Sequence, residues 1–248
     1  MHAKEITIKT DGVFSFSLRE NNWYWFLDMN GEPFIRISNI CGTCSTIFEL
    51  TKKADLPLSP SKLSEIFNKG FNSIPYEVIE MVKLLLPKGV YTVALINLKP
   101  QMPHEYHSWF FRDDFFEKRF WMSKCQDFET DKVPEWHYEI LIPIIDEKSL
   151  KQKQIEFYKK SFDAGEKPIA LSISIDDTRY PSGKGIEHVL AHIILDGHHK
   201  IQAACELGLP ITVLSFLYRG TEDRFYQVEK GILEYYDGNP LEFHSKQA

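Results

Sequence analysis

The segment whose residue types are best suited to chemistry is Asp196-Gly197-His198-His199-Lys200, which follows an apolar run and precedes a helical pattern. The first turn of a helix offers unpaired backbone N–H groups and the positive end of the helix dipole, so an anion binds there readily. Gly197 would let a ligand approach the backbone, and Asp196 is placed to fix an imidazole tautomer or to bind a hydroxyl group or a hydrated metal ion. The segment therefore predicts a phosphate-binding turn.

Three residues of this turn can carry positive charge, namely His198, His199 and Lys200. Positive charge near a helix N-terminus is unfavourable by about 0.3–1 kcal/mol per residue at exposed sites, so the run needs an explanation. A phosphate group that the three side chains neutralise is the simplest one. The alternative is a plain strand-to-helix connection in which the histidines hydrogen-bond to the backbone.

An α/β unit is expected around this turn. Hydrophobic periodicity and turn residues predict strands over 138–145, 168–175, 189–195 and 211–217, and helices over 148–163, 198–207 and about 222–236. Strands that alternate with helices indicate some parallel pairing. The C-terminal half should therefore contain a sheet whose strand ends position the turn.

This order of elements, with its Asp-Gly-His-His-Lys turn, its Ala-rich helix and the connection after Gly208, resembles the ParB/sulfiredoxin-like superfamily, including its ParB-like nuclease domains, over about residues 138–218. The segments Ile142-Pro-Ile144 and Gly165-Glu-Lys-Pro168 resemble the opening strand and the G-x-P-I step of that superfamily. Its members include chromosome-partitioning CTPases, sulfiredoxins and free-serine kinases. The resemblance implies nucleotide or phosphate handling without naming a reaction.

Departures from the family pattern narrow the choice. Sulfiredoxins carry a reactive cysteine where this chain has His198, so sulfinic-acid repair is not expected, and Cys205 is interpreted as a core thiol. Lys200 stands where an arginine is usual and loses the bidentate geometry of a guanidinium group. In the kinase-like members a carboxylate after the first strand is the base for the substrate hydroxyl group, and Asp146 or Glu147 stands at the equivalent point.

The first half of the chain has a different pattern. Alternating polar and apolar residues predict a meander of antiparallel strands with turns at Asp11-Gly12 and Asn30-Gly31, its strands covering 4–9, 12–18, 23–28 and 33–38. A short helical stretch is expected through Phe48 and Leu50, and further elements are two helices from Ser61 to Gly70 and from Pro75 to Pro87 and a strand over 90–98. We therefore expect an α/β protein with an α+β domain of unknown role over 1–135, a ParB/sulfiredoxin-like domain over 136–220, and a C-terminal helix and tail over 221–248.

A Cys-x2-Cys pair, Cys41 and Cys44, lies between a predicted strand and a predicted helix. One interpretation is half of a zinc site that His104 and His107, or Cys125, would complete. A redox dithiol is the second, because a helix N-terminus would lower the pKa of the first thiol. Unliganded thiols are the third.

A second set of metal-ligand residue types occurs along one predicted strand, at Glu187, His188 and His192. At about 3.3 Å per residue, His188 would lie about 26 Å from Asp196. These two residues therefore cannot share one ion.

The composition limits the possible partners. The chain has 248 residues, a formal net charge of −6 and a pI near 5.9, so a broad basic surface for nucleic acid is not expected. Apolar runs stay well below the ~20 residues of a membrane-spanning helix, and no secretory signal pattern occurs. We expect a cytoplasmic protein that does not enter a membrane, with nucleic acid a possible but unfavoured partner.

The expected function is nucleotide or phosphate handling by a phosphotransferase, a nucleotidase or a nuclease-like hydrolase. The candidate catalytic residues are Asp146, Glu147, Asp196, His198 and His199. The candidate phosphate-binding residues are Gly197, His198, His199 and Lys200. The ligand would be a nucleotide or a phosphorylated small molecule, with Mg2+ held or oriented near Asp196. The alternative function is a nucleotide-sensing or DNA-associated module that binds without turnover.

Overall fold

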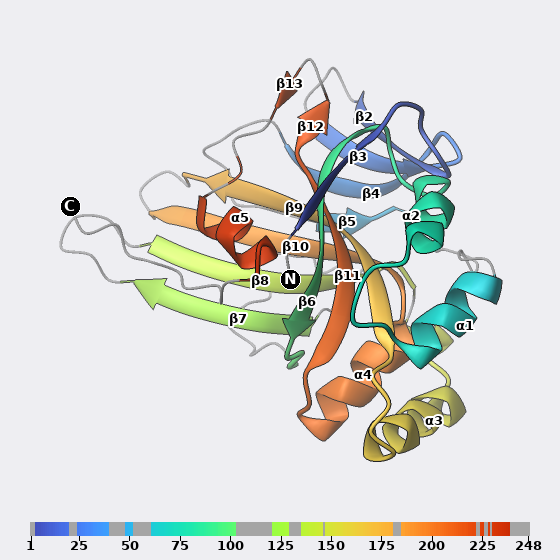
Figure 1. Cartoon of the computed structure of the whole chain (residues 1–248). Helices are drawn as coiled ribbons and strands as arrows, with labels where there is room; N and C mark the ends of the chain where they lie inside the picture. The colour runs from blue at the N-terminus through green and yellow to red at the C-terminus, as the bar shows by residue number, and fades with distance from the viewer. Residues whose placement is uncertain are drawn as a thin grey trace.

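A computed structural model of the chain describes residues 3–19, 24–39, 48–51, 61–102, 121–128, 135–145, 147–180, 185–221, 224–225, 228 and 230–238. A mixed seven-stranded sheet forms its centre, in the order β1-β6-β11-β9-β10-β8-β7 (Figure 1). The strands are β1 (Lys4–Ile8), β6 (Gly89–Leu98), β7 (Trp121–Phe128), β8 (Glu135–Pro143), β9 (Ile169–Arg179), β10 (Ile186–Asp196) and β11 (Ile211–Tyr218). The pairs β8/β10 and β9/β11 are parallel, and the other neighbours are antiparallel. The expected α/β class with partial parallel pairing is confirmed.

A second, antiparallel sheet of four strands follows the order β2-β3-β4-β5. Its strands are β2 (Phe14–Arg19), β3 (Tyr24–Met29), β4 (Glu32–Asn39) and β5 (Phe48–Leu50). Asn30 and Gly31 both have positive φ, at 53° and 79°, so they form the tight turn that the sequence predicts between β3 and β4. Two short strands, β12 (Gly220–Thr221) and β13 (Arg224–Phe225), form a separate pair.

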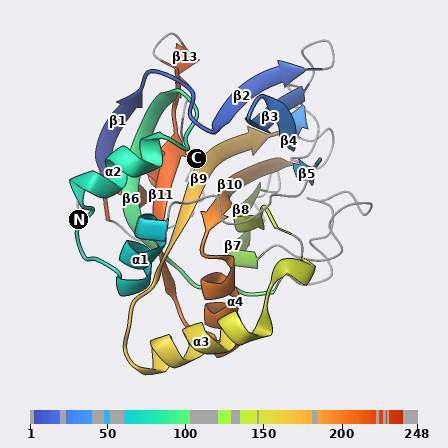
Figure 2. The same cartoon turned by 90° about the vertical axis from the view of Figure 1, so that its right-hand side faces the viewer.

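The helices occupy distinct positions around the large sheet. They are α1 (Ser61–Lys69), α2 (Tyr76–Lys83), α3 (Gln152–Asp163), α4 (His198–Leu207) and α5 (Lys230–Tyr236), and a 3-10 turn covers Glu147–Ser149. Helices α3 and α4 pack against each other at one end of the sheet, and the four-stranded sheet lies towards the other end (Figure 2). Within the described residues no helix is long and apolar enough to cross a bilayer.

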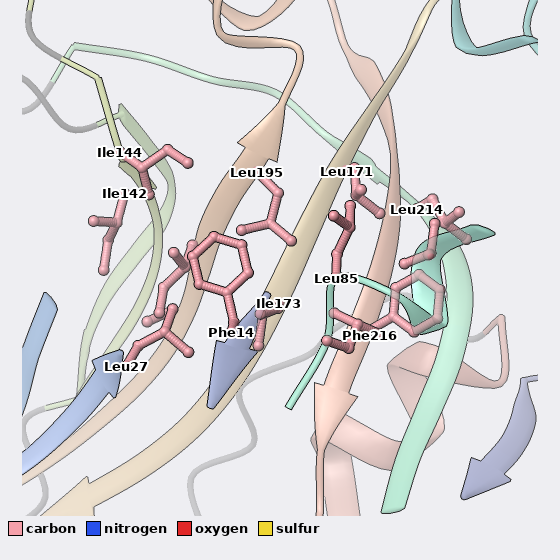
Figure 3. Packing of buried hydrophobic residues seen from close by; sticks show 14 of the residues in the cluster. Phe14, Leu27, Leu85, Ile142, Ile144, Leu171, Ile173, Leu195, Leu214 and Phe216 are labelled. Carbon is pink, nitrogen blue, oxygen red and sulfur yellow. The ribbon is translucent and has the colours of Figure 1, made fainter. Parts of the chain in front are cut away.

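The two faces of the large sheet bury different partners, because successive side chains of a strand point to opposite faces. On one face of β10, Val189, Ala191, Ile193 and Leu195 join a core shared with the four-stranded sheet, α1 and α2. Figure 3 shows this core, where Phe14 and Leu27 pack near Ile173 and Leu195. On the opposite face, Leu190 and Ile194 pack with apolar residues of α4 and α5.

Three expectations about the first half need correction. The segments 4–8 and 14–19 do not pair as a hairpin: β1 pairs with β6, and β2 pairs with β3. Phe48–Leu50 is a strand paired with β4, not a helical stretch. The expected boundary near residue 135 runs through one sheet and one core, because β1, β6 and β7 lie in the same sheet as β8 to β11.

Candidate functional site

The turn between β10 and α4 is built around Gly197. This residue has φ 97° and ψ 16°, a left-handed conformation that glycine adopts without strain. A Cβ atom at this position would lie 2.7 Å from Ala170 Cβ and 2.9 Å from Ala170 Cα on the neighbouring strand β9. The glycine is therefore required by the backbone conformation and by packing against β9. Close approach of a ligand, which the sequence analysis gave as its reason, is not needed to explain it.

His198 is buried and faces the end of β8. Its Nε2 atom accepts a hydrogen bond from the backbone N–H of Ile144 at 3.2 Å. Burial, together with the neighbouring His199, lowers the pKa of His198 to about 3, against an opposing effect of the Ile194 carbonyl. The imidazole is consequently neutral at physiological pH and ties α4 to the segment that follows β8.

His199 makes the corresponding contact at the start of α3. Its Nε2 atom accepts a hydrogen bond from the backbone N–H of Lys151 at 3.0 Å, and Lys151 is the N-cap residue of α3. Burial lowers the pKa of this imidazole too, and the Ser149 backbone opposes that effect. A ring nitrogen that accepts an N–H bond carries no proton, so His199 is also a neutral anchor.

Lys200 points into the protein. Its Nζ atom donates a hydrogen bond to the Ile169 carbonyl at 3.0 Å, and it lies 5.7 Å from the ring centre of Phe67 and 5.6 Å from that of Tyr158. Burial lowers the pKa of Lys200 to about 8, and the nearby charge of Asp196 opposes the shift. Lys200 therefore remains charged at pH 7 but is held by internal partners.

Asp196 ends β10 beside this lysine. One of its carboxylate oxygens, Oδ2, lies 3.9 Å from Lys200 Nζ, is buried, and has no hydrogen-bond partner within the described part of the chain. Burial, and then the charge of Asp196, raises the pKa of Tyr158. Its hydroxyl group donates to Asn68 Oδ1 at 3.1 Å. Asp196 thus has acceptor capacity that the described neighbours do not use.

The charge expected in this turn needs correction. A turn with three positive side chains is not found. The alternative, histidines that hydrogen-bond to the backbone, is what the fold contains: both imidazoles accept backbone N–H groups, and Lys200 donates to the Ile169 carbonyl. Sequence alone shows that a histidine stands in the first turn, but not which way the ring points. The hydrogen-bond partners come from a segment about fifty residues earlier, which no local pattern could have identified.

The segment 144–151 carries the two candidate bases. It is fixed to α4 at one end by Ile144 and at the other by Lys151. Glu147 begins the 3-10 turn within it, and Asp146 lies outside the described residues. The structure therefore brings the backbones of Ile144 and Lys151 to the first turn of α4.

The candidate zinc ligands Cys41, Cys44, His104 and His107 lie outside the described residues, so nothing in the fold bears on them. Cys205, interpreted as a core thiol, is free and half-buried on α4, where burial raises the pKa of its thiol. It packs against the core on the α5 side of the sheet.

A network of hydrogen bonds joins buried polar side chains of three neighbouring strands. Ser174 Oγ lies 2.7 Å from His192 Nδ1, and His192 Nε2 lies 3.4 Å from Glu139 Oε1. The order serine, histidine, carboxylate is that of a hydrolytic triad. All three residues are 0% exposed, however, and Ser174 Oγ also bonds Ser215 Oγ at 2.6 Å. We interpret these hydrogen bonds as a structural network that satisfies buried polar groups.

One cluster escaped the sequence analysis. Glu135, His137 and His188 bring their ligand atoms within 4.8 Å of one another at the end of β10 remote from Asp196. The signal was present, because Glu135 and His137 alternate along β8 and share a face. What sequence could not supply was the parallel register that sets His188 opposite His137.

No protein-family model matches the chain, and neither a curated protein nor a solved structure matches it.

Proposed function

We propose that the β10–α4 turn binds a phosphate-bearing ligand, and that this ligand is a nucleotide. The observation that carries the proposal is the double anchorage of segment 144–151 by His198 and His199. Two buried or half-buried imidazoles hold that segment against a helix N-terminus, where backbone N–H groups favour an anion. Ile144 and Lys151, held in this way, would form one side of a preorganised ligand site.

The geometry revises the roles of the individual side chains. The N–H groups of the first turn of α4 would hold the phosphate, and Lys200 would contribute its charge from the interior, since its Nζ atom is bonded to Ile169. The imidazoles would act as positioning residues. Asp196 Oδ2 is buried and has no hydrogen-bond partner among the described residues. It would accept a hydrogen bond from a hydroxyl group of the ligand, such as that of a ribose.

The order of the elements along the chain supports the ParB/sulfiredoxin-like interpretation. Strand β8, helix α3, strands β9 and β10, helix α4 and strand β11 follow one another in the order expected from the resemblance. In the kinase-like members of that superfamily a carboxylate after the first strand removes the proton of the substrate hydroxyl group. Asp146 or Glu147 would take this role here, which makes phosphoryl transfer or nucleotide hydrolysis the proposed reaction class.

The test is a thermal-shift panel of nucleoside mono-, di- and triphosphates and pyrophosphate, each with and without Mg2+. A ligand at ~100 Kd stabilises the native state by about 2.7 kcal/mol, which is readily measured. Chromatography of the same mixtures separates turnover from binding: a ligand that stabilises and is consumed indicates an enzyme, and one that stays intact indicates a sensor. Absence of any stabilisation across the panel would contradict the proposal.

A matched pair of variants locates the response. His199→Gln supplies an amide oxygen that can accept the Lys151 N–H, whereas His199→Leu cannot. The positioning role predicts that His199→Gln keeps most of the thermal shift and His199→Leu loses it. Equal shifts for the two variants would remove His199 from the site.

A further inference from the structure

The second cluster of chemically capable side chains lies at the opposite end of β10. His188 is eight residues before Asp196 along one strand, which corresponds to about 26 Å at 3.3 Å per residue. The cluster is therefore separate from the β10–α4 turn, and an inference about it does not depend on phosphate binding.

Two parallel strands supply the three side chains. Glu135 and His137 are two residues apart on β8 and point to the same face, and His188 of β10 stands in register with His137. The two imidazole rings are stacked, with centroids 4.3 Å apart and an angle of 16° between their planes. In this arrangement the two ring planes are nearly parallel.

Both imidazoles bring their Nε2 atoms close to one carboxylate oxygen of Glu135. Glu135 Oε1 lies 2.9 Å from His188 Nε2 and 3.3 Å from His137 Nε2. In a tetrahedral zinc site with bonds of about 2.0–2.1 Å, neighbouring ligand atoms are about 3.3 Å apart. The two separations are thus close to those of ligands around one ion, and the stacked imidazoles would turn so that both ring planes meet at it.

We propose that Glu135, His137 and His188 bind one divalent transition-metal ion, with Zn2+ as the expected metal, through Oε1 and the two Nε2 atoms. Two histidines and one carboxylate form a ligand set that zinc and other first-row metals accept. The ion would take the place of the hydrogen bond between His188 Nε2 and Glu135 Oε1.

The surroundings of His188 suit this role. Thr178 Oγ1, on the adjacent strand β9, lies 3.1 Å from His188 Nδ1. When a metal occupies Nε2, the proton moves to Nδ1, which then donates to the threonine hydroxyl, and such a second bond is what orients metal-binding histidines. The side chains of His188 and Glu135 are 14% and 15% exposed, so the cluster is partly open to solvent.

The experiment uses the full, reduced chain after removal of metal by a chelator. Zn2+ is titrated in competition with a chromophoric chelator, and Co2+ is added in parallel for its visible spectrum. We expect one equivalent of Zn2+, a Co2+ spectrum without thiolate charge-transfer bands, and the same results for Cys41→Ser/Cys44→Ser. An equivalent that disappears in this double variant, or no stoichiometric binding to the wild type, would overturn the proposal.

Two substitutions remove ligands. His188→Asn should abolish stoichiometric binding, and Glu135→Gln, which keeps the shape of the side chain and a hydrogen-bonding oxygen, should weaken Zn2+ at least tenfold. Glu166→Gln, at an exposed carboxylate after α3, is the control and should leave the affinity unchanged. If His188→Asn fails to fold, the Glu135→Gln result decides, and an unchanged affinity for that variant would overturn the site.

Discussion

The imidazole of His198 accepts the backbone N–H of Ile144 at 3.2 Å, and this bond joins the first turn of α4 to the residue that directly follows β8. A histidine that looks like a phosphate ligand in the sequence is thus a neutral, buried anchor. The neighbouring His199 does the same for Lys151. Together they fix the segment that separates β8 from α3.

The first prediction concerns the energetic weight of this anchor. His198→Leu leaves the Ile144 N–H without its acceptor in a buried place, which costs about 1–3 kcal/mol of the free energy of unfolding. The matched variant His199→Leu should cost less, because His199 is only half-buried and water can replace the imidazole. Urea denaturation of both variants measures the difference. Equal stability of His198→Leu and the wild type would show that the bond contributes nothing.

The second prediction concerns Lys200 and pH. Burial lowers its pKa from the ordinary 10.5 to about 8, so the folded state disfavours the charged form. Between these two pKa values the unfolded chain binds more protons, and stability therefore rises with pH. The cost of the buried charge is complete at pH 7 and is relieved as the pH rises from about 8 to 10.5, by about 3 kcal/mol at most.

The variant Lys200→Met isolates this effect from the other groups that titrate. Lys200 faces the carboxylate of Asp196, the Ile169 carbonyl and the rings of Phe67 and Tyr158. The wild type should gain stability relative to Lys200→Met as the pH rises above 8, in a series of urea denaturations. A difference in the free energy of unfolding between the two proteins that stays constant up to pH 10.5 would contradict the lowered pKa of Lys200.

A third prediction compares Gly197 and Gly208, which flank α4 and share a left-handed conformation. Gly208→Ala meets no atom within 4 Å, so it should cost only the conformational strain, about 1–2 kcal/mol. Gly197→Ala adds a contact 2.7 Å from Ala170 Cβ and 2.9 Å from its Cα, and it should cost clearly more. The midpoints of thermal unfolding rank the two. A smaller loss for Gly197→Ala would mean that the backbone of β9 yields at Ala170.

The limits of sequence-based prediction are clear from particular residues. Asn30 and Gly31 form the expected turn because a tight hairpin is a local event. Asp11 and Gly12 carry the same kind of signal, yet the Gly12 N–H bonds the Leu86 carbonyl at 2.9 Å, so the chain leaves β1 towards another part of the fold. Local propensity therefore located the strand β1 but not its partner, which comes from about eighty residues later.

At the candidate site, too, the sequence predicted the local elements but not their tertiary partners. The sequence located the strand, the glycine turn and the helix, because their periods and caps are local. The helix is confirmed from His198 to Leu207, whereas the strand expected over 189–195 runs from Ile186 to Asp196. It did not show that His198 and Lys200 point inward, since their acceptor and donor partners belong to other elements. The cluster around His188 was missed for a related reason: its register with β8 is a tertiary fact.

The central claim, that the first turn of α4 binds phosphate through its backbone, is tested most directly by backbone amide NMR of the deuterated full chain during titration with the most stabilising nucleotide of the panel and with pyrophosphate. The account predicts saturable shifts that are largest at the amides of Gly197, His198, His199 and Lys200, with smaller ones at Ile144 and Lys151. The same titration of His199→Leu should give smaller shifts at these amides. Shifts that stay below noise at these amides, or that are largest elsewhere, would contradict the assignment.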